Sequence, residues 1–203
     1  MRLAASGGDS LATTTDAPCV QSLIAALDVA VDLQPIAARC AAVKQVLEST
    51  LTDPAVALPA ELLKPCADRY ARRLLHRDPL GRYTVVAMVW NAGQGTPLHD
   101  HASMWCVECV YRGRIRVVSY SHLGTEGGRH RFSRETEVFA GVGEAGALIP
   151  PFEYHTIENA EASPSVTLHV YGGDMVWCHA FVADGDAYRQ EVRRLCYTED
   201  GAA

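Results

Sequence analysis

The N-terminal quarter of the chain carries a helical pattern of apolar positions. From Cys19 to about Ser49, apolar residues recur at three- and four-residue spacing, the periodicity of an amphipathic helix. Pro35 interrupts the pattern, because a proline ring cannot continue through a helix interior, so a helix is predicted on either side of it. A further helix is predicted between Pro59 and Leu75, where Ala60-Glu61-Leu62-Leu63 is a strong opening.

Beyond residue 78 the pattern changes from helical to strand-like. Asp78-Pro79-Leu80-Gly81 predicts a turn, and the next segments are short, apolar and rich in β-branched residues. Short strands at this spacing, separated by glycine-rich turns, indicate an all-β barrel or jelly roll. The predicted strands are 83–90, the segment around 99–106, 114–120, 136–140, 147–149, 155–158, 166–171 and 176–182, with surface loops at 124–131 and 160–164.

Together these patterns predict a mainly β fold with an N-terminal helical cap. The 203 residues suit one domain with a sizeable core. We expect a flexible tail over residues 1–18, rich in Ser, Thr and Gly, then a single domain over 19–203. Within that domain the cap is predicted over 19–76 and the β-barrel over 82–197.

Charge and hydropathy exclude several classes of partner. The net charge is −6 and the pI about 5.7, which argues against nucleic acid or an anionic membrane as a partner. No apolar run approaches the roughly 20 residues that span a bilayer. We also expect a monomer, and the cysteines predict a cytoplasmic protein.

The seven cysteines fit that compartment, where thiols stay reduced. Cys106 and Cys109 form the one Cys-x-x-Cys pair. On a strand their sulfurs would face opposite sides, which disfavours shared chelation of a metal.

His99 and His101 are the first candidates for metal ligands. On a strand, residues i and i+2 project from one face, so both imidazoles can reach one point, as a metal requires. A His-x-His pair alone is a weak signal, since most such surface pairs bind nothing. The surroundings are more specific: Gly93, five intervening residues before His99, and Gly113 resemble the first motif of the cupin superfamily. Cys106 stands where that motif usually carries a glutamate ligand.

A second segment resembles the other cupin motif and offers a third histidine. Pro150 is followed five residues later by His155 and four residues after that by Asn159, although Phe152 replaces the usual glycine. The alternative for His155 is a partly buried strand histidine with one hydrogen bond. Three neutral imidazoles would leave a divalent metal its full charge and favour an anionic substrate ligand such as a thiolate.

The order of features over residues 68–182 resembles the cysteine dioxygenase family of thiol dioxygenases. The features are Tyr70-Ala71-Arg72, Trp90, His99-Asp100-His101, Cys106, Gly113, His155 with Ile157-Glu158-Asn159, Leu168-His169-Val170-Tyr171 and Cys178-His179-Ala180-Phe181. This resemblance implies a cupin-type β-barrel that binds Fe(II). It places His99, His101 and His155 on the iron ligands.

The same resemblance implies catalytic roles for Tyr171, Cys106 and His169. Tyr171 falls on the active-site tyrosine that hydrogen-bonds the substrate, and Cys106 on the cysteine that forms a thioether bond to that tyrosine in the mammalian-type enzymes. His169 matches the histidine that orients the tyrosine hydroxyl, in a relay where Thr167 replaces a serine. The alternatives are an alternating core strand for His169 and Tyr171, and a small buried residue for Cys106.

For substrate binding the resemblance implies Arg72 and Tyr70. Arg72 falls on the arginine that clamps the substrate carboxylate, a task that suits the two-pronged guanidinium, and Tyr70 on its neighbour. The alternative for Arg72 is a residue on a helix surface. Trp105 departs from the mammalian pattern.

The implied function is Fe(II)-dependent conversion of L-cysteine and O₂ into cysteine sulfinic acid. Family members that act on 3-mercaptopropionate usually carry glutamine in place of the arginine, so Arg72 and Cys106 together favour cysteine. The alternatives are a dioxygenase of 3-mercaptopropionate or another small thiol acid, and a non-catalytic cupin that binds a small acid.

Overall fold

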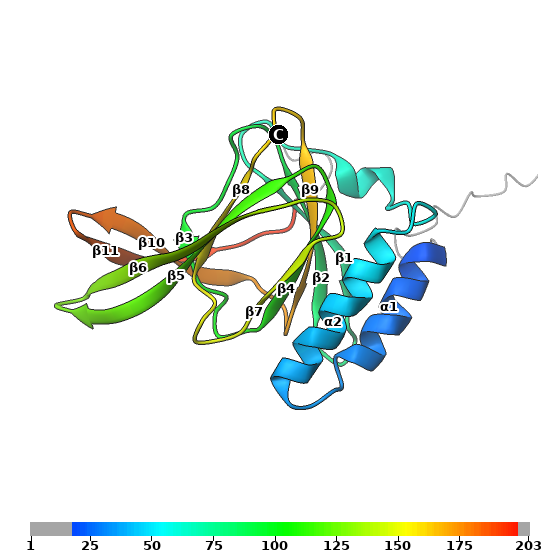
Figure 1. Ribbon diagram of the computed structural model, residues 1–203, viewed down its shortest axis with the longest axis horizontal. Helices are drawn as coiled ribbons and strands as arrows, with labels where there is room; N and C mark the ends of the chain where they lie inside the picture. Colours follow the sequence, from blue (N-terminus) through cyan, green and yellow to red (C-terminus); the bar gives the residue numbers. More distant parts are fainter. Residues whose placement is uncertain (1–17, 199–203) are drawn as a thin grey trace, which may run out of the picture.

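Two antiparallel helices cover one side of a β-barrel in the computed structural model, which describes residues 18–198 (Figure 1). The helices are α1 (Pro18–Ala30) and α2 (Ile36–Leu51), followed by a single 3-10 turn at Ala60–Leu63. Pro35 separates the two helices, as the periodicity predicts. The tail predicted over 1–18 lies outside the described residues, apart from Pro18, which begins α1.

The strands form two sheets. The first has the order β1-β2-β9-β4-β7, and the second closes on itself in the order β10-β11-β6-β5-β8-β3. The hairpins β5–β6 and β10–β11 extend away from the side that the helices cover (Figure 1). The strand bounds are β1 Ala71–Arg77, β2 Thr84–Trp90, β3 Leu98–His99, β4 Cys106–Arg112, β5 Ile115–Glu126, β6 Arg129–Ala140, β7 Ala145–Leu148, β8 His155–Asn159, β9 Ser165–Tyr171, β10 Trp177–Asp184 and β11 Ala187–Arg194.

The strands β2 and β9 are buried at every residue, because the helices cover one face of the first sheet and the barrel interior covers the other. Alternate residues therefore enter two different cores. Leu168 and Val170 pack with Leu27 and Leu47 of the helices, whereas Tyr171 packs inside the barrel with Cys106. Only the interior face can contribute side chains to a site within the barrel.

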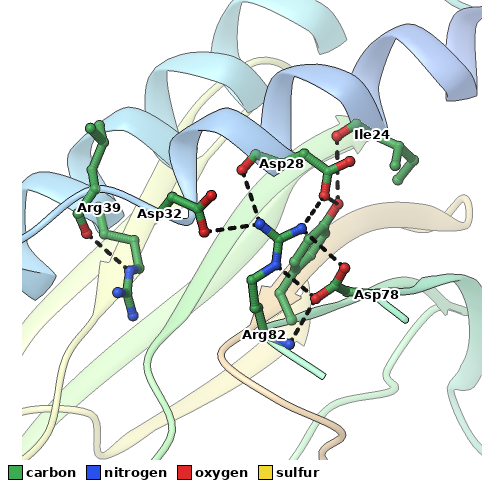
Figure 2. Close-up of polar contacts among 8 residues, drawn as sticks. Ile24, Asp28, Asp32, Arg39, Asp78 and Arg82 are labelled. Atoms are coloured by element: carbon green, nitrogen blue, oxygen red, sulfur yellow. Dashed lines mark hydrogen bonds and ion pairs between the residues drawn. The ribbon is translucent and has the colours of Figure 1, made fainter. Parts of the chain in front are cut away.

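Arg82 ties the helical layer to the barrel (Figure 2). Its guanidinium lies 2.6 Å from Asp28 of α1, 2.9 Å from Asp32 and 2.9 Å from Asp78 in the turn before β2. The Asp78 side chain is only 3% exposed, and its hydrogen bonds from Arg82 lower its pKa from 3.8 to about 2. Tyr83 also donates to Asp28, at 3.2 Å.

The mainly β fold with two N-terminal helices is confirmed, but several local predictions are wrong. The helix predicted between Pro59 and Leu75 ends after one 3-10 turn, since Pro65 disfavours helical backbone at Lys64. The barrel consequently begins at Ala71, inside the segment 19–76 assigned to the cap. The strand around the His-x-His pair covers only Leu98–His99, and β11 was not predicted because it is rich in charged residues.

The predicted loop at 124–131 is also shorter than expected. Strands β5 and β6 run to Glu126 and from Arg129, so only Gly127 and Gly128 form the turn. The loop at 160–164, between β8 and β9, is confirmed. Among residues 18–198, no helix combines the length and apolar character needed to cross a membrane.

We predict that Asp78→Asn lowers the melting temperature by several degrees at neutral pH. The folded-state pKa of Asp78 lies below its value of 3.8 in an unfolded chain, so its ionised form stabilises the fold above pH 4. That stabilisation disappears as the pH falls from about 4 to about 2. Thermal denaturation followed by circular dichroism between pH 2 and 7 measures both effects.

The matched control is Asp68→Asn, which removes the same charge from an exposed aspartate beside Arg69. This variant should follow the wild-type curve. An Asp78→Asn curve that coincides with the wild type at neutral pH would show that the Arg82 network does not stabilise the docked helices.

Candidate metal and substrate-binding site

Three histidines meet inside the barrel. His99 comes from β3 and His155 from the facing position of β8, with which it is paired, while His101 follows two residues after His99. One ring nitrogen from each lies within 4.8 Å of the others. The ring centroids are 5.1 Å apart for His99 and His101, 4.6 Å for His99 and His155, and 5.0 Å for His101 and His155.

His101 reaches this cluster from a turn, not from a strand. Ala102 and Ser103 have φ of 50° and 65°, and the amide of Met104 donates to the carbonyl of His101, which closes the turn. Asp100, between the two histidines, accepts from the Nδ1 and backbone amide of His179 at 2.7 and 2.9 Å. This tether to β10 holds the turn, so both histidines face the barrel interior although β3 has already ended.

The histidine rings are buried and neutral. Burial lowers the pKa of His99 and brings those of His101 and His155 well below their ordinary value. Nδ1 of His101 and both ring nitrogens of His155 have no hydrogen-bond partner among the described residues. Unpartnered polar atoms in a buried site are costly, and a divalent cation bound by three imidazoles would satisfy them. The donor set therefore fits a metal ion.

His99 has a defined tautomer. Its Nδ1 lies 3.1 Å from the carbonyl of Pro97, which can only accept, so Nδ1 carries the proton. The lone pair is then on Nε2, the form in which an imidazole ligates a metal through that atom.

Glu108 is a buried carboxyl behind the cluster that sequence analysis missed as a site residue. It lies on the interior face of β4, two residues after Cys106, and is 5% exposed. Its oxygens approach Nδ1 of His155 at 3.8 Å and Nδ1 of His169 at 3.5 Å. Burial raises the pKa of Glu108 to about 8. A carboxyl next to the outer nitrogen of a ligating histidine commonly orients that ligand.

Strand β9 supplies the wall opposite the histidines. Trp90 donates to Thr167 at 3.0 Å, and the Thr167 hydroxyl lies 2.7 Å from Nε2 of His169, so this part of the predicted relay is present. The predicted hydrogen bond from His169 to the Tyr171 hydroxyl is absent. The two rings stack with centroids 5.8 Å apart, and the Tyr171 hydroxyl donates to Sδ of Met88 at 3.6 Å. Alternate residues of a strand stand side by side, which favours stacking over an end-to-end hydrogen bond.

Cys106 and Tyr171 are directly opposed on β4 and β9. Both are buried, and burial raises the pKa of each well above its ordinary value. The other half of the Cys-x-x-Cys pair, Cys109, faces the helices, and all cysteines described are free. The separation of the two sulfurs onto opposite faces is thus as predicted.

Arg72 enters the cavity from β1. Its Nη2 donates to the carbonyl of Met175 at 3.0 Å, while Nη1 is buried without a hydrogen-bond partner among the described residues. Arg72 is only 5% exposed and lies on a strand, so the predicted alternative, an exposed position on a helix, is wrong. Tyr70, next to β1, packs against Trp90, with ring centroids 4.7 Å apart and ring planes tilted by 33°.

All the predicted site residues except Cys106 line one cavity of about 120 Å³. The loop 95–97 forms part of its rim, and Gly95 is needed there because a Cβ would lie 2.7 Å from Cβ of Glu158 in β8. Four lining residues from the C-terminal part of the chain were not predicted to belong to the site: Met175, Cys178, Arg193 and Leu195. Two of them belong to or follow β11, whose charged sequence carries no motif. The buried guanidinium of Arg72, with its Nη1 free, and three metal-competent imidazoles can together bind a small anionic molecule that also ligates a metal.

Comparison with known proteins points to one family. Residues 16–184 match the family model described as "Cysteine dioxygenase type I". Among curated relatives, human cysteine dioxygenase type 1 is 23% identical and the rat protein 25% identical, each over 114 residues that are 56% of this chain and 56% of the relative. The chain thus spans about half the length of the curated relatives it matches.

Solved structures with a similar fold are more distant. The TT1209 protein from Thermus thermophilus has a TM-score of 0.45 and 19% identity, covering 56% of this chain and 92% of that one. A conserved protein with a double-stranded β-helix domain from Klebsiella pneumoniae has a TM-score of 0.44 and 16% identity, covering 61% and 94%.

We predict that His155→Ala abolishes stoichiometric binding of Fe(II), because only two imidazoles remain. Glu108→Gln keeps all three ligands and should weaken binding by about 10-fold, since it alters only the group behind His155. Competition with a chromophoric chelator under anaerobic conditions measures both affinities.

The control for these variants is His122→Ala, which removes a histidine of β5 that is not part of the three-histidine cluster. Its affinity should equal that of the wild type. If His155→Ala still bound one Fe(II) per chain with the wild-type affinity, His155 would not be a metal ligand.

Proposed function

Because the chain belongs to the cysteine dioxygenase type I family, we propose that it is an Fe(II)-dependent thiol dioxygenase. The proposed reaction adds both atoms of O₂ to the sulfur of L-cysteine and yields cysteine sulfinic acid. The observation that carries the proposal is the convergence on one cavity of three neutral histidines, two of them with unsatisfied ring nitrogens, and the free Nη1 of Arg72.

The proposed metal ligands are His99, His101 and His155. Iron held there would supply the redox chemistry that joins O₂ to a thiol, and the protein would supply orientation and electrostatics. With only neutral ligands the ion would retain its double charge, which favours binding of the substrate as a thiolate.

Arg72 is the proposed carboxylate-binding residue. The hydrogen bond to Met175 fixes one end of the guanidinium, so the free Nη1 is already oriented before the substrate arrives. A preoriented cation in a buried cavity binds a carboxylate more strongly than a mobile surface lysine does, because little side-chain entropy is lost. Tyr70, which packs against Trp90, would form the adjacent wall.

Tyr171 is the proposed hydrogen-bond donor to the reacting end of the substrate. Its pKa is raised by burial and by neighbouring Cys106, so the phenol stays protonated at neutral pH and can donate. Its hydroxyl donates to the sulfur of Met88, a weak acceptor that a bound polar group would readily replace. His169 would hold this strand face through Thr167, and a thioether between Cys106 and Tyr171 would fix the ring further.

We predict that the iron-loaded protein consumes one O₂ per thiol and forms a sulfinate. Oxygen-electrode measurements, with mass spectrometry of the product, should show turnover of L-cysteine and a lower kcat/KM for 3-mercaptopropionate, which lacks the amine. Zinc-loaded protein is the control and should be inactive, because zinc has no accessible redox chemistry.

The outcomes separate the alternatives. A higher kcat/KM for 3-mercaptopropionate than for L-cysteine would favour a 3-mercaptopropionate dioxygenase. Stoichiometric iron binding without oxygen uptake on any thiol would favour a non-catalytic cupin. Retained turnover by His155→Ala would contradict the proposed ligand set.

We also predict that Arg72→Gln raises KM for L-cysteine by about 10- to 100-fold, as expected for the loss of a charged hydrogen bond worth about 1.5–3 kcal/mol. Glutamine retains a donor toward Met175, so the fold should be preserved. Initial-rate kinetics under air measure the change.

The matched control is Arg69→Gln, which removes the same charge from an exposed arginine paired with Asp68. Its KM should stay at the wild-type value. If Arg72→Gln leaves both kcat and KM unchanged, Arg72 does not bind the carboxylate.

A further inference from the structure

The cavity that contains the three histidines has two arginines in its lining and, among the described residues that line it, no aspartate or glutamate. Arg72 is the buried one. Arg193 is the other, and neither sequence motifs nor the family match, which ends at residue 184, assign it a role. The positive charge of the cavity is therefore larger than one substrate carboxylate would match.

Strand register explains how Arg193 reaches the cavity. It lies directly opposite Cys178 in the β10–β11 pair, and opposed residues share one face of a sheet. Cys178 lines the same cavity, as does Leu195, two residues after Arg193 on the same side of the chain. Arg193 lies near enough to Tyr70 to lower the pKa of its hydroxyl, against the larger effect of burial.

Arg193 stands at the mouth of the cavity and Arg72 deeper inside. The Arg193 side chain is 47% exposed, whereas Arg72 as a whole is 5% exposed. The nearest carboxylate to Arg193 is Glu191, at 3.9 Å, an open ion pair on the surface that contributes little and is easily exchanged for another anion. Arg193 is thus available to a molecule that extends from the cavity toward solvent.

L-cysteine leaves this second cation without a partner. Its thiolate would be matched by the metal and its carboxylate by Arg72, and its remaining group is an amine, which gains nothing from a nearby guanidinium. A thiol with a second acidic group would complete the charge match. The cavity is small, about 120 Å³, so the two acidic groups must be only a few bonds apart.

We propose that this site takes small thiols bearing two carboxylates, with one carboxylate bound by Arg72 and the other by Arg193 at the mouth. The inference rests on the proposed function and extends its substrate class beyond thiols with one carboxylate. Arg193 acts as a specificity-determining residue, and its contribution depends on the second carboxylate.

The test compares Arg193→Met with the wild type in two assays. In turnover by the iron-loaded enzyme, mercaptosuccinate should have a higher kcat/KM than L-cysteine or 3-mercaptopropionate. Arg193→Met should lower kcat/KM by about 10- to 100-fold for mercaptosuccinate, the loss expected for one charged hydrogen-bonding group, and leave 3-mercaptopropionate within about 2-fold. Arg193→Lys, which keeps the charge, should recover part of the preference.

The second assay needs no turnover. Isothermal titration of the metal-free protein with succinate and propionate should show tighter binding of succinate, and Arg193→Met should remove the difference. Arg194→Met is the matched control: the neighbouring side chain lies on the opposite face of β11, opposed to Trp177, and its loss should preserve the preference.

The two assays separate the inference from the proposed function. Turnover of thiols with no advantage for mercaptosuccinate, together with equal binding of succinate and propionate, would overturn the inference and leave the proposed function standing. Succinate preference that depends on Arg193 without oxygen uptake on any thiol would support a dicarboxylate site and refute the dioxygenase.

Discussion

The structure depends on the burial of three imidazoles within 4.8 Å of one another. A buried ring nitrogen without a partner costs free energy, and among the described residues the cluster contains three of them, Nδ1 of His101 and both ring nitrogens of His155. The strands and the turn around the cluster keep the three rings buried, and therefore neutral, and directed toward one another. The pairing of β3 with β8 sets two of them face to face, and the Asp100 tether to His179 turns the third inward.

The layer of helices has an indirect part in this arrangement. Helices α1 and α2 cover the outer face of β2, β4 and β9 and pack against the apolar residues there. The inner face of β9 is therefore free to carry Thr167, His169 and Tyr171. Polar residues on an interior strand face are tolerated only when they are mutually bonded or have a ligand. Arg82 anchors the helices to the turn that leads into β2, and so fixes the strand on which Met88 and Trp90 lie.

Much of the site could be predicted from sequence because its residues lie in short motifs with fixed spacing. His99 and His155 needed only the two glycine- and proline-marked segments and a place on a strand. His101 was assigned to the same strand as His99, but it reaches the cluster from the turn that Asp100 tethers to His179. The relay failed at its last step because His169 and Tyr171 stand side by side on β9 and stack, while packing in the barrel directs the Tyr171 hydroxyl to Met88. The helix assigned to Pro59–Leu75 was wrong since a run such as Leu74-Leu75 is apolar in either period, and only pairing with β2 decides for a strand. Arg193 and Glu108 carry no motif; they belong to the cavity and its surroundings through strand register alone.

The distribution of charge around the cluster shows how an acidic chain can offer a cavity suited to anions. The net charge of the protein is −6, yet the cavity presents Arg72 and Arg193 and no carboxylate among its described lining residues. The buried carboxyl of Glu108 stands behind His155 and His169 and does not line the cavity, and burial raises its pKa to about 8, which disfavours its anionic form. Positive groups therefore face the entering molecule, and this carboxyl lies beside the outer ring nitrogens of His155 and His169. Because the field in a low-dielectric cavity is set by the nearest charges, this local ordering outweighs the net charge of the surface.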